Sequence, residues 1–223
     1  ALGPVTAPLD NIPTSWYVSA MNVEPKIPAR RRILDAAVKL IRIKGYNATT
    51  VDDLCAEAGV TKGAFFHHFK SKDGLGTAAA QHWTDITVPL FEAAPYHAPK
   101  RPLDRVLAYI DFRKAIIRGE LAEFTCLAGT LAQEVHTSHP AIAHAAGEAI
   151  TGHAATLVAD IQAAMDENGR TFNFSAESLA LHTQAALQGG FILAKSTGDP
   201  AHAEETITHL RRYIELTFQK TAA

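Results

Sequence analysis

The stretch TTVDDLCAEAGVTKGAFFHHFKSKDGL, residues 49–75, decides the fold of this chain. It predicts two short helices that are joined by a tight turn and followed by basic residues. Thr50 is positioned to cap the first helix, and Asp53 three residues later completes a capping box. Gly59 ends that helix, and Thr61 is positioned to cap the second one. This arrangement is typical of a helix-turn-helix unit that binds DNA.

Apolar residues repeat at helical spacing in both predicted helices. Leu54 and Ala58 lie four residues apart, as do Phe65 and Phe69, so the two apolar faces can close around Val60. The first turn of the second helix then remains free to enter the major groove of DNA. That turn carries Lys62, Gly63 and Ala64.

Residues 58–75, AGVTKGAFFHHFKSKDGL, resemble the DNA-binding domain of the TetR (tetracycline repressor) family of bacterial transcription regulators, which carries a pattern like AGVSKGTLYYHFKSKEEL. The resemblance extends upstream through residues 30–50. It implies an all-α fold with an N-terminal three-helix helix-turn-helix domain and a C-terminal helical domain for ligand binding and dimerisation. The residues that we expect to contact DNA are Arg30, Arg31, Thr50, Thr61, Lys62, Gly63, Ala64, Phe66, His67, His68 and Lys72.

Two of these positions depart from the family's pattern. Phe66 replaces a frequent tyrosine and has no hydroxyl to offer a phosphate. Ala64 replaces threonine or serine, which leaves at most methyl contact with a thymine. Lys62 is therefore expected to be the main base reader. His67 and His68 lie beside lysines, which favours phosphate contact over a solvated surface pair.

Residues 28–44 are predicted to form the first helix, with Gly45 just past its end. Arg30, Arg31 and Arg32 at its start either contact phosphates or form a solvated helix end, and we expect at least one to contact DNA.

The charge distribution agrees with a DNA partner once it is divided by region. Residues 26–75 carry ten Lys and Arg against five Asp and Glu, a net of plus five. Residues 76–223 carry eleven against sixteen, a net of minus five. The whole-chain charge of −2 would alone argue against nucleic acid, so the asymmetry is the informative quantity. DNA binding should weaken steeply with salt.

The length of 223 residues predicts two domains, which we assign to residues 26–74 and 75–223. Residues 1–25 contain four prolines and no Lys or Arg, and are expected to form an arm. Met21 leaves open whether residues 1–20 are native. No signal peptide or membrane-spanning run is predicted, so we expect a bacterial cytoplasmic, nucleoid-associated protein without a membrane partner. Two cysteines in different predicted domains argue against a disulfide.

The second predicted domain contains helices that could enclose a cavity. Ser71 is expected to cap a helix that links the domains, and residues 103–118 form the next helix, with apolar residues on two sides. Such a helix can pack on the bundle with one side and line a ligand chamber with the other. The alternative is a core that these side chains fill completely. For His153, a core histidine whose hydrogen bonds are made within the protein is the stronger interpretation. The expected pocket residues are Trp83, Phe91, Tyr109, Phe112, Ile116, Cys126, Leu127, Leu131 and His153.

Three further helices are predicted after residue 139. Pro140 starts a long helix that stops at Asn168 and Gly169. Residues 175–195 and 201–221 form a hairpin, which the resemblance identifies as a four-helix dimer interface. A two-fold dimer would place two recognition helices on successive major grooves of a palindromic site. Intrachain core is the alternative for the expected interface residues Ala186, Gly189, Gly190, Ile207, Leu210, Ile214 and Phe218.

Eleven histidines do not predict a metal site. His136 and His139 straddle a predicted helix end, and neither His144 nor Glu148 supplies a third ligand at the interval that a zinc site shows. We expect neither metal nor cofactor. An enzyme that uses Cys126 and a histidine is the rival from another class, but no phosphate loop, nucleophile turn or carboxylate pair accompanies them. No catalytic residue is predicted.

The sequence therefore predicts a transcriptional repressor that binds a palindromic operator as a homodimer and is released by a small, largely apolar effector. A closer alternative is a DNA-binding regulator whose helical domain only dimerises or answers to a protein partner. An interior cavity in the helical domain would discriminate between the two.

Overall fold

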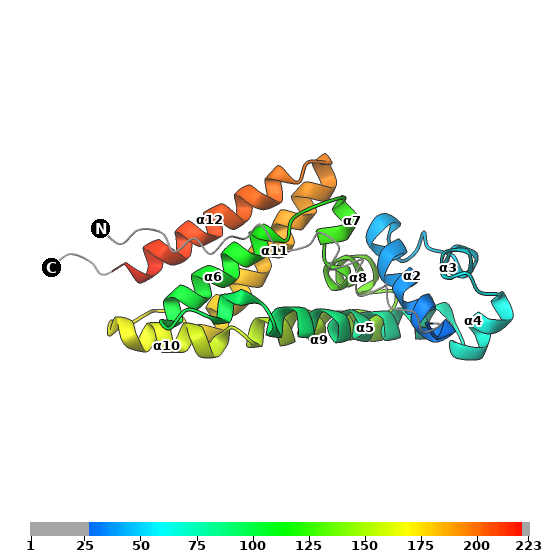
Figure 1. The fold of residues 1–223 in the computed structure, drawn as a ribbon, viewed down its shortest axis with the longest axis horizontal. Coiled ribbons are helices and arrows are strands. Elements are labelled where there is room, and N and C mark those ends of the chain that lie inside the picture. Colours follow the sequence, from blue (N-terminus) through cyan, green and yellow to red (C-terminus); the bar gives the residue numbers. More distant parts are fainter. Residues whose placement is uncertain (1–26, 220–223) are drawn as a thin grey trace.

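A computed structural model describes residues 27–219, and this part of the chain is helical with no strand, as predicted. Figure 1 shows α2, α3 and α4 at one end, α6 and α10–α12 at the other, and α5 and α9 along the long axis between them. The elements are α2 (Ala29–Lys44), α3 (Val51–Ala58), α4 (Lys62–His68), α5 (Lys72–Glu92), η2 (Pro95–His97), α6 (Pro102–Ala115), α7 (Leu121–Phe124), α8 (Leu127–Val135), α9 (Pro140–Ala155), α10 (Val158–Asn168), α11 (Ala176–Thr197) and α12 (Ala201–Phe218).

The helix-turn-helix forms through the caps that its sequence predicts. The Thr50 hydroxyl accepts a hydrogen bond from the backbone N–H of Asp53 at 3.1 Å, and the Asp53 carboxylate accepts one from the backbone N–H of Thr50 at 2.8 Å. Gly59 ends α3 with a left-handed φ of 59°, a conformation that glycine adopts without strain. Thr61 caps α4 through Ala64 at 3.2 Å. These local predictions are confirmed.

The core beneath the helix-turn-helix extends into the second predicted domain. Phe65 is fully buried and packs in one cluster with Leu127, Leu131 and Ile142 of α8 and α9. The guanidinium of Arg32 donates to the carbonyl oxygens at the end of α3, at 2.8 and 3.1 Å, so this arginine supports the fold. The three-helix unit is therefore packed onto the helical domain through a continuous apolar core.

The prediction of one long helix from Pro140 to Asn168 is wrong in one respect. The chain forms α9 and α10 with a break at Thr156 and Leu157. Both backbone N–H groups bond three residues back, to His153 and Ala154, and the Thr156 hydroxyl also donates to the His153 carbonyl at 2.7 Å. These tighter bonds interrupt the α-helical ladder without a Pro or Gly to mark the place.

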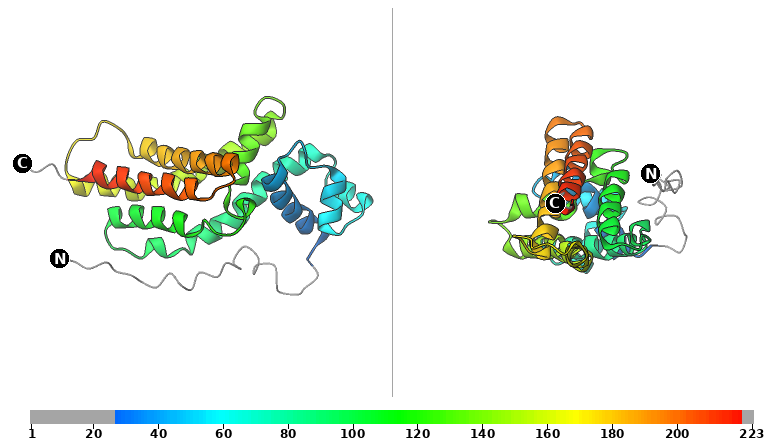
Figure 2. Two further views of the ribbon diagram at one scale, coloured as in Figure 1. Left: turned by 90° about the horizontal axis from the view of Figure 1, so that it is seen from above. Right: turned by 90° about the vertical axis from the view of Figure 1, so that its left-hand side faces the viewer.

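The predicted hairpin of α11 and α12 is present, and Figure 2 shows the two helices side by side. Gly190 permits this approach, since a Cβ there would lie 3.3 Å from the Ala203 backbone. The predicted arm, residues 1–25, and the predicted end of the last helix at Thr221 lie outside the described residues. No helix within residues 27–219 combines the length and the apolar character that crossing a membrane requires.

Candidate nucleic-acid interface and ligand cavity

The first turn of α4 presents its side chains at the surface. Lys62 and Gly63 are exposed, Ala64 is partly exposed, and Phe66 is 48% exposed despite being aromatic. Thr61, in the cap before them, is also exposed. The Lys62 ammonium contacts the Asp52 carboxylate at 2.7 Å, and both side chains remain largely open to solvent. This ion pair raises the pKa of Lys62, so the lysine stays charged and can exchange Asp52 for another acceptor.

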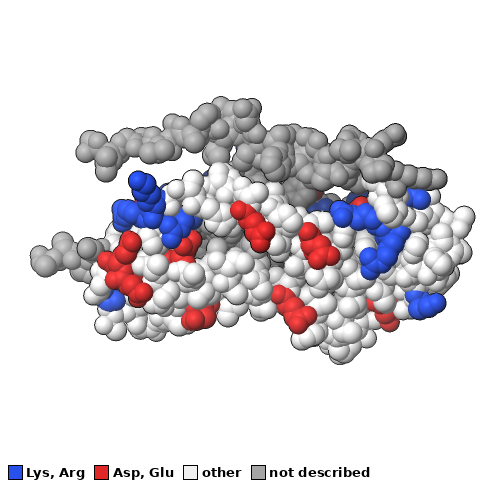
Figure 3. Space-filling view, turned by 60° about the horizontal axis from the view of Figure 1, so that its bottom comes forward, with Lys and Arg blue, Asp and Glu red and all other residues white. Residues whose placement is uncertain are grey.

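The basic residues that flank α4 lie at the same end of the molecule. Figure 3 shows Lys and Arg grouped over the end that carries α2–α4, a second basic group at the opposite end, and acidic residues between them. Arg30 is exposed above the ring of Phe69, with 5.5 Å between guanidinium carbon and ring centroid. Arg31 lies 3.0 Å from Asp35, which also contacts His82 at 2.7 Å. Both arginines are exposed residues at the start of α2.

Three of the expected phosphate contacts differ in their surroundings. The rings of His67 and His68 pack edge to face, with centroids 4.9 Å apart, and His67 is the more exposed. Lys72 instead turns toward its own chain. Its ammonium donates to the Asn47 carbonyl at 3.2 Å and lies 4.3 Å from the centroid of the Tyr46 ring. Burial against these groups lowers the pKa of Lys72.

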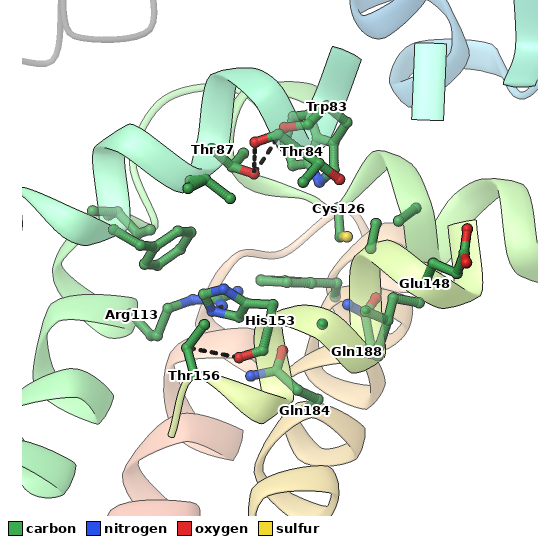
Figure 4. Close-up of a pocket in the computed structure, with 18 of the residues that line it drawn as sticks. Trp83, Thr84, Thr87, Arg113, Cys126, Glu148, His153, Thr156, Gln184 and Gln188 are labelled. Atoms are coloured by element: carbon green, nitrogen blue, oxygen red, sulfur yellow. Dashed lines mark hydrogen bonds between the residues drawn. The ribbon is translucent and has the colours of Figure 1, made fainter. Parts of the chain in front are cut away.

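A cavity of about 280 Å³ lies in the helical domain, between α5, α6, α9 and α11 (Figure 4). The predicted pocket residues on its wall are Trp83, Phe91, Ile116, Cys126 and His153. Tyr109 and Phe112 are buried behind the wall, next to Phe91. Leu127 and Leu131 lie in the core that α8 shares with the helix-turn-helix. Helical periodicity thus identified some residues of the cavity wall, but it did not separate them from residues that are buried behind the wall.

Apart from His153, the sequence reasoning missed the polar groups of the cavity. Arg113, Gln184 and Gln188 line it, together with Thr87. A search for apolar positions does not find such residues. One signal was available for Arg113, because it lies four residues after Tyr109 and therefore on the same face of α6.

A hydrogen-bond network centres on the Tyr109 hydroxyl. Arg113 Nη1 donates to this oxygen at 3.0 Å and Gln184 Nε2 donates to it at 2.9 Å. The hydroxyl lies 2.9 Å from His153 Nε2. Because it already accepts two bonds, we assign its own proton to that third bond, which places the His153 proton on Nδ1. Burial, and then the charge of Arg113, lower the pKa of His153 to about 3, so the imidazole is neutral.

Two family models match the chain. Residues 33–79 match the model described as bacterial regulatory proteins, tetR family. Residues 102–210 match the one described as tetracyclin repressor-like, C-terminal domain. The chain belongs to the TetR family. It is a DNA-binding transcriptional regulator, and TetR regulators are not enzymes. Among residues 27–219, no three metal-binding side chains come together at one point.

Curated relatives match over part of their length. The transcriptional repressor DhaR of a Mycobacterium species is 26% identical over 110 residues, which cover 49% of this chain and 54% of the relative. The transcriptional regulator AcuR of Cereibacter sphaeroides is 26% identical over 107 residues, or 48% of this chain and 49% of AcuR. YerO of Bacillus subtilis, an uncharacterised regulator, is 36% identical over 59 residues, 26% of this chain and 20% of YerO. This TetR chain thus spans about half or less of these relatives.

Solved TetR structures share most of the described fold. A TetR regulatory protein from Rhodobacter sphaeroides superimposes with a TM-score of 0.73 and 20% identity over 83% of this chain and 98% of its own. The reduced form of E. coli NemR gives a TM-score of 0.66 and 23% identity over 82% and 96%. At these identities the likeness establishes the fold alone.

Proposed function

We propose that the protein is a repressor that binds a palindromic operator as a homodimer and is released by a small, largely apolar effector. The observation that carries this proposal is the cavity of about 280 Å³ inside the helical domain. A regulator whose helical domain only dimerises has no need of an interior chamber lined by convergent polar groups. The cavity therefore favours a ligand-responsive repressor over that alternative.

The outer face of the hairpin is the surface that we propose for dimerisation. The apolar residues first expected there, Ile207, Leu210, Ile214 and Phe218, are buried against their own chain. Ala186 and Gly189 are partly exposed on α11. The large apolar side chains that face solvent on α11 and α12 are Leu181, Ile192, Leu193, Tyr213 and Leu216, each 44–58% exposed. Exposed apolar side chains of this size on two neighbouring helices support a protein interface, and a second copy of the chain presents the same side chains.

Release by an effector requires that the cavity and the DNA-binding helices share a moving part. Helix α5 supplies Trp83 and Phe91 to the cavity wall, and it begins directly after α4. In the proposed dimer, one spacing of the two α4 helices fits the operator and another does not. An effector that binds the second form more tightly would shift the population away from DNA by linkage. When bound to its operators, the protein would be associated with the nucleoid.

The test is selection of bound sequences from a random duplex pool by the purified protein near physiological salt. Enrichment of an inverted repeat supports a dimeric, sequence-specific regulator, and the spacing of its half-sites measures the distance between the two α4 helices. Salt-sensitive binding without enrichment would contradict operator recognition by the protein alone.

A further inference from the structure

The cavity contains a positive charge that no residue in the described part of the chain neutralises. Arg113 on α6 is 8% exposed, and no carboxylate of residues 27–219 lies within ion-pairing distance of its guanidinium. Its Nε–H is buried without an acceptor in the same residues. The acidic residue on the cavity wall, Glu148, is largely exposed and contacts His144 at 3.4 Å. Since a buried cation is costly without an anion, this site is prepared to receive one.

Aromatic rings surround this guanidinium and determine how an anion can reach it. The ring centroids of Phe91, Tyr109 and Phe191 lie 5.2, 5.9 and 5.8 Å from the guanidinium carbon. Nη1 of Arg113 is engaged with the Tyr109 hydroxyl. Nε and Nη2 have no hydrogen bond to described residues, and their planar fork matches the two oxygens of a carboxylate.

A second donor lies beside the arginine. Figure 4 shows His153 next to Arg113 among the lining residues, and their nitrogens Nε2 and Nη1 are 3.5 Å apart. With the His153 proton on Nδ1, that N–H has no acceptor among residues 27–219 and can donate to a ligand oxygen. The imidazole ring is neutral, so it can donate a hydrogen bond to the ligand without requiring a second negative charge on it. The pair therefore suits one anionic group.

We propose that the effector is a monocarboxylate with a flat aromatic body, whose carboxylate pairs with Arg113 while its ring packs among Phe91, Phe124 and Phe191. This proposal rests on the proposed function, because it names the chemistry of that effector. At roughly 30 Å³ per water molecule in the liquid, the cavity volume corresponds to on the order of ten non-hydrogen atoms. A single ring with a carboxylate on a short chain has that size, and the aromatic walls favour a ring over a branched aliphatic body.

The test is a calorimetric titration of the full chain with benzoate, phenylacetate and 3-phenylpropanoate, each beside its uncharged primary amide. The acid and the amide of a pair share shape and ring, so their difference in affinity isolates the charge. We expect at least one acid to bind roughly tenfold or more tightly than its amide, because a hydrogen bond to a charged partner is the stronger kind. Trp83 on the cavity wall gives a second, fluorescent signal of binding.

Three substitutions on α6 separate the effect of Arg113 from that of general charge. Arg113→Met removes the cation and keeps a long apolar chain, so the preference for the acid should disappear. Thermal stability should be unchanged or higher, since an unpaired buried charge is lost; a purely structural arginine would give the opposite result. Lys114→Met is the matched control, because Lys114 is exposed and bonds Thr208 outside the cavity at 2.9 Å. Arg113→Lys keeps the charge and should retain part of the preference.

Three results would overturn the proposal: equal affinities of the parent protein for acid and amide, an acid preference that survives in Arg113→Met, or no binding by any of the three acids. The first and third results are measured on the parent protein, so the proposal can be contradicted even if a variant fails to fold. Operator affinity is measured separately, with and without the acid that binds. An acid that occupies the cavity but leaves operator binding unchanged would support the ligand class and contradict release by that effector.

Discussion

The carboxylate of Glu134, in the last turn of α8, accepts a hydrogen bond from the backbone N–H of Tyr46 at 2.6 Å. The N–H of Asn47 donates to the same carboxylate at 2.8 Å. Both amides belong to the turn between α2 and α3, so this one side chain of the helical domain fixes that turn, in addition to the shared apolar core. The other end of α8 is capped by Cys126, which lines the cavity. One short helix therefore connects the cavity wall to the DNA-binding unit.

We predict that Glu134→Ala lowers the free energy of unfolding by about 2–3 kcal/mol, because two backbone N–H groups lose a charged acceptor. It should also weaken operator binding, since the reader loses its fixed orientation. Denaturant unfolding and an operator titration measure the two effects. Glu57→Ala is the control, as Glu57 forms an exposed ion pair with Lys39 and should change stability by less than about 1 kcal/mol. Equal losses in both variants would contradict a holding role for Glu134.

Lys62→Ala should weaken operator binding and relax base preference at one position. Lys62 is exposed on the first turn of α4, and in the proposed complex it would exchange Asp52 for a base edge, a contact worth about 1–3 kcal/mol. Binding to a set of operators with single base changes measures both effects. Lys39→Ala removes an equally exposed lysine from α2 and should leave the preference intact. An unchanged preference in Lys62→Ala would remove this residue from base reading.

Lys72→Ala should weaken binding to all sequences alike and reduce the slope of log K against log salt by about 0.9, the value for one phosphate contact. In the free protein the Lys72 ammonium donates to Asn47 and lies over Tyr46. The prediction thus requires this ammonium to change partners on DNA. Slopes measured for parent and variant over the same salt range decide the matter. Parallel lines would mean that Lys72 supports the turn and does not touch phosphate.

The sequence predicted those features that depend on local chemistry. The caps at Thr50 and Thr61 follow from side chains that bond amides three residues away, and both are present. The break at Thr156 could not be predicted in the same way. It arises from hydroxyl and backbone hydrogen bonds that compete with the helix, and no Pro or Gly at this position marks it in the sequence. Periodicity also shows that a face is buried without showing what covers it. That is why Ile214 was first expected at a dimer interface, although it packs inside its own chain.

The cavity shows the same limit from another side. Apolar spacing led to Phe91 and Ile116, which lie on the wall, because core and cavity share one apolar signature. Arg113 was missed, since a charged residue at a helical position is most often solvated and its burial depends on helices far along the chain. Arg113, the residue that is most informative about ligand chemistry, is therefore one that a search for apolar positions cannot find.

Acid should destabilise the protein partly through His153. Its pKa of about 3 in the folded state lies below the value of about 6.5 expected for an unfolded chain. Between these values the unfolded chain binds a proton that the folded chain does not, so stability rises with pH by up to about 1.4 kcal/mol per unit. The parent should therefore lose up to about 2 kcal/mol more than His153→Gln between pH 7 and pH 5. Denaturant unfolding at several pH values measures this, and identical pH dependence in the two proteins would count against a neutral His153.

Leu216→Glu should convert the proposed dimer to a monomer. Leu216 is 58% exposed on α12, and in a two-fold dimer across the hairpin a carboxylate at this position would lose its hydration without a partner. The particle mass from light scattering should halve, and operator affinity should fall because each half-site is then bound separately. Ile43→Glu is the matched control: Ile43 is 56% exposed on α2, away from the hairpin, so this variant should remain dimeric. A Leu216→Glu protein that keeps the dimer mass would move the interface to another face and leave the exposed side chains of α11 and α12 unexplained.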